Sequence, residues 1–166
     1  MKDNQRILFK KVFDENSKKV FHLCYGYTGD KDSANDLMQE TFIKVWQHLD
    51  GFRNQAQLST WIYRIAVNTC LSYLRTAKRK ATDELNDHII ENYSEEPSEK
   101  NEQVALLYKS ISQLEENERL LITMVLDEVP YPEIAEIAGI SEGNLRVKIH
   151  RIKQKLTEIY NRNERI

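Results

Sequence analysis

The stretch Pro132–Leu145, with the sequence PEIAEIAGISEGNL, decides the fold prediction for the C-terminal part of the chain. Two short helices that cross at a tight turn need a small residue at the crossing, which Ala135 provides, and a residue that tolerates positive φ in the turn, which Gly139 provides. Ser141 is a good N-cap for the second helix, and Pro132 suits the first turn of the first one. The apolar residues expected to fill the space between the helices are Ile134, Ala138, Ile140 and Leu145. We therefore predict a helix-turn-helix.

The second helix of this motif is predicted to run from Ser141 to about Tyr160. Residues three and four positions apart give it one buried apolar stripe, formed by Leu145, Ile149, Ile152 and Leu156. Its opposite face carries the candidate DNA contacts, which are Arg146, Val147, Lys148, His150 and Arg151, with Lys153 and Lys155 beside them. Arginine can read guanine edges, and a small apolar side chain can contact the methyl group of thymine. The pattern favours binding in the major groove, and an ordinary helical hairpin with a solvated basic face is the alternative.

Helical periodicity also dominates the N-terminal part. One helix, capped by Asp30 or Asp32, is predicted from an apolar stripe at Ala34, Leu37, Met38, Phe42, Val45, Trp46 and Leu49. The preceding segment, Ile7–Tyr27, is predicted to form one or two helices that end at Gly26 and Gly29.

Gly51 ends this pattern, and a polar loop, Phe52–Leu58, leads into a long helix that Ser59 or Thr60 would cap. Its expected apolar side comprises Leu58, Trp61, Ile62, Ile65, Ala66, Tyr73 and Leu74. Helical patterning resumes at Val104 and continues through a short helix, Glu118–Asp127. With 5 Gly and 3 Pro the chain has too few turn residues for an all-β fold, so we predict an all-α protein with two small helical domains.

Charge alternates along the chain although the net charge is only −2. The stretch Arg53–Lys80 holds six basic residues and no acidic one, Ala81–Gln103 holds eight acidic residues and one lysine, and Glu142–Ile166 holds seven basic and three acidic residues. The acidic stretch contains Pro97 and a single apolar pair, Ile89–Ile90, so it is predicted to be a flexible linker. Two cationic surfaces joined by an anionic tether point to nucleic acid as a partner.

Other classes of function find no support in the residues. Cys24 and Cys70 lie far apart in apolar contexts, without metal-ligand spacing, and are expected to be reduced core thiols. The four histidines stand in no recognisable catalytic spacing, and no Gly-rich phosphate loop is present. We therefore expect no cofactor, no metal and no enzymatic activity. The polar N-terminal residues, Met1–Arg6, and the lack of a long apolar run predict a cytoplasmic protein without membrane insertion.

Four further segments carry a resemblance to a known family: DLMQETFIKVW at Asp36–Trp46, STWIYRIAVN at Ser59–Asn68, YLR at Tyr73–Arg75 and IHRIKQKL at Ile149–Leu156. Their sequences and order resemble those of sigma-70 family subunits of RNA polymerase, and the small two-domain layout looks like the extracytoplasmic-function (ECF) group. The resemblance implies region 2 in residues 1–80, an acidic linker in 81–103 and region 4 in 104–166. It also implies promoter-specific initiation with core RNA polymerase and promoter DNA as partners, and an anti-sigma factor as an inhibitor.

The resemblance further implies roles for individual residues. Contacts to the coiled coil of the polymerase clamp are expected from Asp36, Gln39 and Glu40. Phe42 and Trp46 are further candidates, with the core of the domain as the alternative, which the place of Phe42 in the apolar stripe favours. The residues implied in recognition and melting of the −10 element are Phe52, Arg53, Asn54, Gln55, Arg64, Asn68 and Arg75. A flipped base costs a few kcal/mol of unstacking energy, which aromatic and amide groups in such a loop could offset.

Two alternatives remain open at this point. A helix-turn-helix regulator that works without polymerase would need only residues 104–166 and would dimerise on a palindrome, but it leaves the N-terminal motifs unexplained. The acidic linker could also thread the polymerase cleft in place of nucleic acid, or it could be a solvated tether.

Overall fold

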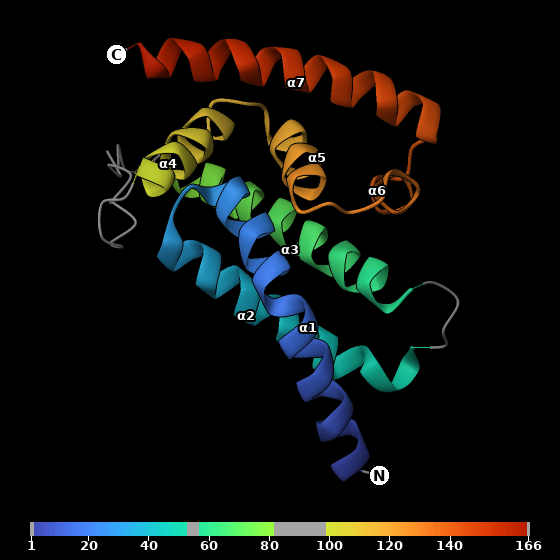
Figure 1. Ribbon diagram of the computed structural model, residues 1–166. Helices are drawn as coiled ribbons and strands as arrows, with labels where there is room; N and C mark the ends of the chain where they lie inside the picture. The colour runs from blue at the N-terminus through green and yellow to red at the C-terminus, as the bar shows by residue number, and fades with distance from the viewer. Residues whose placement is uncertain (1, 53–56, 82–98, 166) are drawn as a thin grey trace.

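The computed structural model describes residues 2–52, 57–81 and 99–165 of the 166-residue chain, and within them all regular structure is helical. The elements are α1 (Lys2–Thr28), α2 (Lys31–His48), the 3₁₀ helix η1 (Leu49–Gly51), α3 (Leu58–Ala81), α4 (Glu99–Ile111), α5 (Glu116–Leu126), α6 (Tyr131–Ala138) and α7 (Glu142–Glu164). The prediction of an all-α fold is confirmed. We call α1–α3 the N-terminal half and α4–α7 the C-terminal half (Figure 1).

Helix α1 is one continuous helix, in which Gly26 lies inside the last turn rather than at the end. The residue that does end it is Gly29, whose φ of +70° is readily adopted only by glycine. Asp30 then caps α2, because its carboxylate accepts a hydrogen bond from the backbone N–H of Ser33 at 3.1 Å. Of the two predicted capping residues, Asp30 is therefore the one that caps α2. The prediction that Gly29 ends the preceding helix is confirmed, and the prediction that Gly26 does so is wrong.

The start of α3 also differs from the prediction. The helix begins at Leu58, so Ser59 and Thr60 lie inside its first turn and cap nothing. Thr60 is fully buried there. The predicted apolar side is only partly correct, because Ile62 and Ala66 are buried whereas the Tyr73 ring is exposed and its hydroxyl donates to Ser33 Oγ.

The acidic segment falls largely outside the described residues, which omit 82–98. At its two ends the helices extend further than the sequence pattern indicated. Helix α3 includes Ala81, and α4 begins at Glu99 instead of Val104.

The helix-turn-helix is formed by α6 and α7 and follows the prediction closely. Gly139 is left-handed at φ 70°, and the Ser141 hydroxyl accepts from the backbone N–H of Asn144 at 3.2 Å. The predicted stripe of α7 is buried together with Ile159. Ala138 was expected between the helices but is exposed at the end of α6, whereas Ile134 and Ala135 of the same helix are buried.

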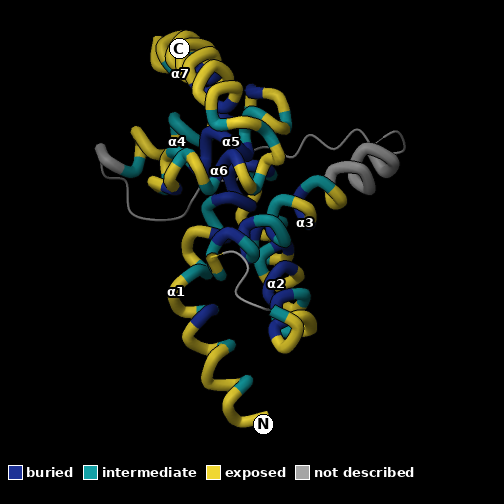
Figure 2. Tube along the Cα trace, turned by 90° about the vertical axis from the view of Figure 1, so that its right-hand side faces the viewer, coloured by how far each residue is buried: buried dark blue, intermediate teal, exposed yellow. Residues whose placement is uncertain are grey.

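The two halves pack against each other and share one hydrophobic core (Figure 2), with α1 against α5 and α3 against α6. At Gly26 the backbone of α1 lies so close to α5 that an added Cβ would collide with the Thr123 side chain. Arg119 of α5 donates to the carbonyl oxygen of Tyr27 at 2.8 Å and lies over the Tyr27 ring. His22 Nδ1 and Asp127 Oδ1 are 2.9 Å apart. This arrangement is closed, with helices from both halves in direct contact.

Candidate polymerase and nucleic-acid interfaces

The outer face of α2 presents the polar residues that the sequence singled out. Asp36, Gln39 and Glu40 are all exposed, on the side of α2 away from its buried stripe. Glu40 is held in place, because Lys44 lies 3.3 Å from its carboxylate and also donates to Thr69 Oγ1 of α3 at 3.2 Å. Acceptor groups on a rigid helix form a surface suited to a protein partner that carries basic side chains.

The two aromatic candidates on α2 have different positions. Phe42 is 3% exposed and packs edge-on against Phe13, with ring centroids 4.8 Å apart. Trp46 is half-buried and packs against Phe9 at 5.2 Å. The structure therefore places the Phe42 ring in the core, and only Trp46 keeps part of its ring at the surface.

The loop before α3 is described only at its two ends. Phe52 packs against Trp61 with ring centroids 5.1 Å apart, so its ring lies on the N-terminal half and is partly buried. The remaining loop candidates, Arg53, Asn54 and Gln55, lie outside the described residues. Trp61, which was predicted on the apolar side of this helix, does contact the core.

Two candidates on α3 lie against the C-terminal half. The Arg64 guanidinium donates to the Glu136 carboxylate at 3.1 Å and to the Glu136 main-chain oxygen at 3.4 Å. Asn68, one turn on, is exposed and lines a crevice of about 320 Å³ between the halves, which Lys148 of α7 also lines. Candidates for −10 and −35 recognition thus border the same crevice. Arg75 lies in the last turns of α3, and its side chain is not described.

Close packing of the halves also affects two tyrosine hydroxyls. Burial raises the pKa of Tyr27, with the carboxylate of Glu116 adding to the effect. Burial likewise raises the pKa of Tyr63 on α3, where Asp127 and Glu133 of the C-terminal half add to it. Both groups therefore remain neutral in the closed arrangement well above the pH at which an exposed tyrosine ionises.

The DNA-reading candidates on α7 all lie on its exposed side. Val147, Lys148, His150 and Arg151 are exposed, and Val147 keeps 52% of its surface accessible. Arg146 is less available, because it pairs with Glu142 at 2.8 Å and lies over the Tyr131 ring.

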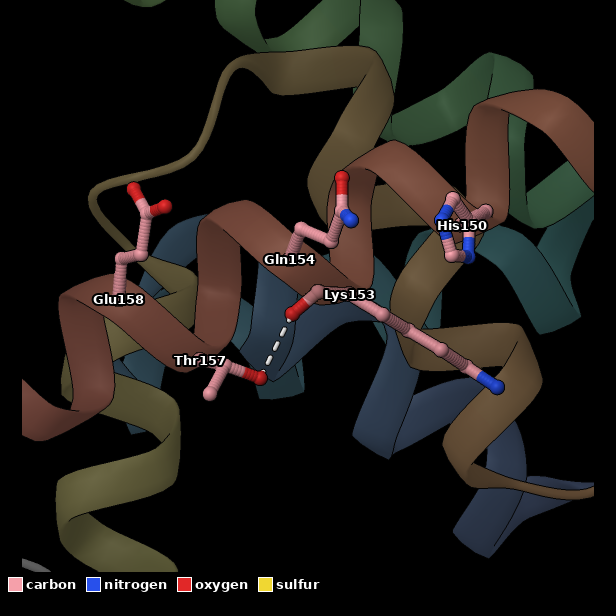
Figure 3. Close-up of a pocket in the computed structure, with 5 residues that line it drawn as sticks. All are labelled: His150, Lys153, Gln154, Thr157 and Glu158. Carbon is pink, nitrogen blue, oxygen red and sulfur yellow. Dashed lines mark hydrogen bonds between the residues drawn. The ribbon is translucent and has the colours of Figure 1, made fainter.

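Beyond His150, the outer side of α7 continues as an open hollow (Figure 3) lined by His150, Lys153, Gln154, Thr157 and Glu158. Thr157 donates its hydroxyl hydrogen to the Lys153 carbonyl, so it is occupied within the helix. The carboxylate of Glu158 ends the cationic surface, because a negative charge there would repel phosphate groups. The face suited to DNA therefore extends from Arg146 to about Gln154.

No cluster of His, Cys, Asp and Glu among the described residues could hold a metal ion. In the same part of the chain, every helix is too short or too polar to cross a membrane.

Comparison with known proteins gives matches over both halves. The Sigma-70 region 2 family matches residues 12–80, and the Sigma-70, region 4 family matches residues 105–156. The ECF RNA polymerase sigma factor SigM of Bacillus subtilis is 29% identical over 154 residues, covering 91% of this chain and 94% of SigM. The ECF RNA polymerase sigma-E factor of Salmonella typhimurium is 34% identical over 151 residues, covering 83% of this chain and 78% of that protein.

Two solved structures share the fold. The sigma factor RpoE from Bartonella quintana, in complex with the anti-sigma factor NepR, superposes with a TM-score of 0.77 at 22% identity, covering 92% of this chain and 96% of that one. CnrH, in complex with the cytosolic domain of CnrY, gives a TM-score of 0.70 at 19% identity, covering 94% and 89%. The sequence matches and the helix-turn-helix agree, and the chain therefore belongs to the sigma-70 family as an ECF sigma factor, a subunit that directs RNA polymerase to promoters.

Proposed function

We propose that this sigma factor divides its work between the two halves. Residues 1–80 bind core polymerase and recognise and melt the −10 element, residues 104–166 read the −35 element, and 81–103 connect them. The observation that carries the proposal is the exposed polar face of α2, where Asp36, Gln39 and Glu40 project from a helix whose other side is core. The subunit locates the promoter and opens the DNA strands, while polymerase carries out the chemistry in the cytoplasm.

The −10 and −35 contacts follow from the chemistry of the residues. Arg64, Arg75 and Arg53 would hold phosphates, and the groups of Phe52, Asn54, Gln55 and Asn68 would receive unstacked bases. On α7, Arg146 and Arg151 are suited to guanine edges and Val147 to a thymine methyl, while Lys148 and His150 face phosphates or bases. Phe42 contributes to polymerase binding only through the core that supports α2, whereas Trp46 retains an exposed edge.

The closed arrangement sets a condition on DNA binding. Arg64 is engaged by Glu136, and the crevice beside Asn68 is bordered by α5, α6 and α7. DNA on α3 would compete with these contacts. We expect the halves to separate when promoter DNA is bound.

An anti-sigma factor is the natural regulator of such a subunit. Both solved relatives were determined in complex with a second protein, which for RpoE is named as an anti-sigma factor. An inhibitor of this chain would act by covering the exposed face of α2 or by holding the closed arrangement. Co-purification from the native cell would identify it.

The test is binding to bacterial core polymerase followed by run-off transcription. The wild type is compared with a Gln39→Ala/Glu40→Ala variant and with a matched control, Asp14→Ala/Glu15→Ala, which changes two exposed polar residues on α1. We expect tight binding and promoter-dependent transcripts from the wild type and the control, and weak binding from the α2 variant. Absence of binding by the wild type, in a preparation free of inhibitor, would contradict the proposal.

A further inference from the structure

Arg146 has two contacts that hold its guanidinium at the start of the DNA-facing side of α7. Its Nη2 donates to the Glu142 carboxylate at 2.8 Å, and its Cζ lies over the Tyr131 ring, 5.1 Å from the ring centre. An ion pair between residues four positions apart is common on exposed helices, so this pair alone carries no argument. The ring comes from a different helix, α6, and the direction of the arginine is therefore set by the helix-turn-helix and not by α7 alone.

Both partners of the arginine are themselves fixed. Tyr131 is the first residue of α6 and stands between Pro130 and Pro132, whose rings restrict φ on either side of it. Its side chain is half-buried and packs against the hydrophobic core. Glu142 lies in the first turn of α7, where the helix dipole favours a carboxylate. We call Tyr131, Glu142 and Arg146 the arginine clamp.

The arginine clamp limits the direction of the guanidinium without covering it. The Arg146 side chain keeps 63% of its surface accessible, and a guanidinium has five N–H donors, so donors remain for a further partner. A phosphate is a poor partner here, because the Glu142 carboxylate would repel it. The edge of a guanine is uncharged, and its O6 and N7 accept two hydrogen bonds from the planar fork of an arginine. The clamp is therefore suited to a base edge.

We propose that the arginine clamp reads one guanine of the −35 element, with Arg146 donating to O6 and N7 and with Tyr131 and Glu142 as positioning residues. The inference rests on the proposed reading of the −35 element by α7. It extends that role to α6, because Tyr131 governs the base preference without touching DNA. An arginine that is already oriented loses less side-chain freedom on binding and turns less readily to a neighbouring phosphate. The clamp therefore raises discrimination between bases more than overall affinity.

The experiment uses holoenzyme reconstituted from the full chain and bacterial core polymerase, which selects sequences from duplex DNA with both promoter elements randomised. We expect the wild type to prefer guanine at one upstream position and Arg146→Ala to lose the preference at that position alone. Tyr131→Leu should lower the same preference by about twofold to fivefold, the range of a cation–π contact at an exposed site, and leave the other positions unchanged. Tyr131→Phe keeps the ring face and should select like the wild type.

Glu142→Gln tests the carboxylate of the clamp. It should weaken the guanine preference by about twofold and raise the affinity for every duplex, because a negative charge near DNA is removed. Glu158→Gln makes the same charge change at an exposed residue further along α7 and should raise affinity with unchanged base preference. Tyr160→Leu, at a half-buried tyrosine near the end of α7, is the matched control for Tyr131→Leu and should select like the wild type. Thermal unfolding of each variant shows that the fold is retained.

Several results would overturn the inference and leave the proposed function standing. An even loss of affinity for all sequences in Arg146→Ala, with a weaker dependence on salt, assigns Arg146 to a phosphate. Equal changes at every position in Tyr131→Leu, or an equal loss in Tyr131→Phe, mean that the ring face does not position Arg146. Unchanged preference in both Tyr131→Leu and Glu142→Gln removes their positioning role. Holoenzyme that forms but selects no upstream sequence rejects the proposed −35 role and this inference together.

Discussion

Helices α2 and α3 belong to the same half of the molecule, yet their candidate contacts differ in availability. On α2 the acidic and amide candidates face outward. On α3, Arg64 is paired with Glu136 of α6, and Asn68 borders the crevice between the halves. The proposed polymerase surface is therefore open in the isolated chain, whereas the proposed −10 surface is shared with the helix-turn-helix. Binding of polymerase and binding of DNA have different structural requirements, and substitutions at the contact between halves should separate them.

The largest effect is expected at Gly26, where α1 and α5 approach most closely. Gly26→Val places a branched side chain against Thr123 and should lower the free energy of unfolding by up to about 3 kcal/mol or force the halves apart. Small-angle scattering would then show a larger radius of gyration, while polymerase binding through α2 is retained. Gly143→Val on the exposed side of α7 is the matched control, because nothing lies within 4 Å of an added Cβ there. Unchanged stability and size would show that the close contact is not maintained in solution.

Arg119 gives the next effect, because its guanidinium spans both halves. Arg119→Met keeps most of the aliphatic stem but removes the hydrogen bond to the Tyr27 carbonyl, and should cost about 1.5–2 kcal/mol in urea unfolding. The control is Lys109→Met, at an exposed residue of α4, which should change the free energy of unfolding by less than about 0.5 kcal/mol. Equal stabilities of the two variants would mean that Arg119 does not hold the halves together.

Alkaline pH should weaken the closed arrangement without any substitution. The folded pKa values of Tyr27 and Tyr63 are raised above the ordinary value of 10, so the unfolded chain releases these protons first. Their contribution to stability is therefore complete below pH 10 and is lost as pH rises above it, by about 1 kcal/mol for each group between pH 10 and 11.

Tyr63→Phe provides the control for this titration. The Tyr63 hydroxyl is buried without a hydrogen-bond partner among the described residues, so the variant should be as stable as the wild type at neutral pH. Above pH 10 it should lose less stability than the wild type does. Parallel curves for the two proteins would assign the alkaline loss to other groups.

Glu136 should give the smallest change in stability and the most specific change in binding. Glu136→Gln removes an exposed ion pair with Arg64 that contributes less than about 1 kcal/mol. Freed from the carboxylate, Arg64 should bind a single-stranded −10 oligonucleotide with an affinity raised by about twofold to fivefold. Glu102→Gln, at an exposed residue of α4, makes the same charge change away from Arg64. Equal gains in both variants would indicate net charge alone.

Local signals explain why much of the fold could be predicted from the sequence. Gly139, Ser141 and the apolar stripe of α7 act within a few residues of one another, and the structure shows each in its expected role. Ser59 and Thr60 are equally plausible caps by residue type, but the helix starts before them. Capping preference fixes the position of a helix end only to within a residue or two.

Contacts between distant segments could not be predicted in this way. Gly26 is read as a helix end by composition, while its role is to let the backbone of α1 approach Thr123. Arg64 lies in a stretch without acids, yet it is paired with Glu136, 72 positions away. For the site, exposure of Asp36, Gln39 and Glu40 follows from the stripe on α2, whereas the burial of Phe42 depends on rings from α1.

The two cysteines of the chain lie on α1 and α3, with their sulfur atoms 3.8 Å apart and fully buried. The hydrogen bond to Cys24 and burial both raise the pKa of the Cys70 thiol, so the Cys70 thiolate is scarce in the folded chain. An alkylating reagent would modify these residues only when α1 and α3 come apart. The rate of labelling therefore reports how often α1 and α3 separate, and a cysteine added on the surface could carry a fluorophore without removal of the native pair.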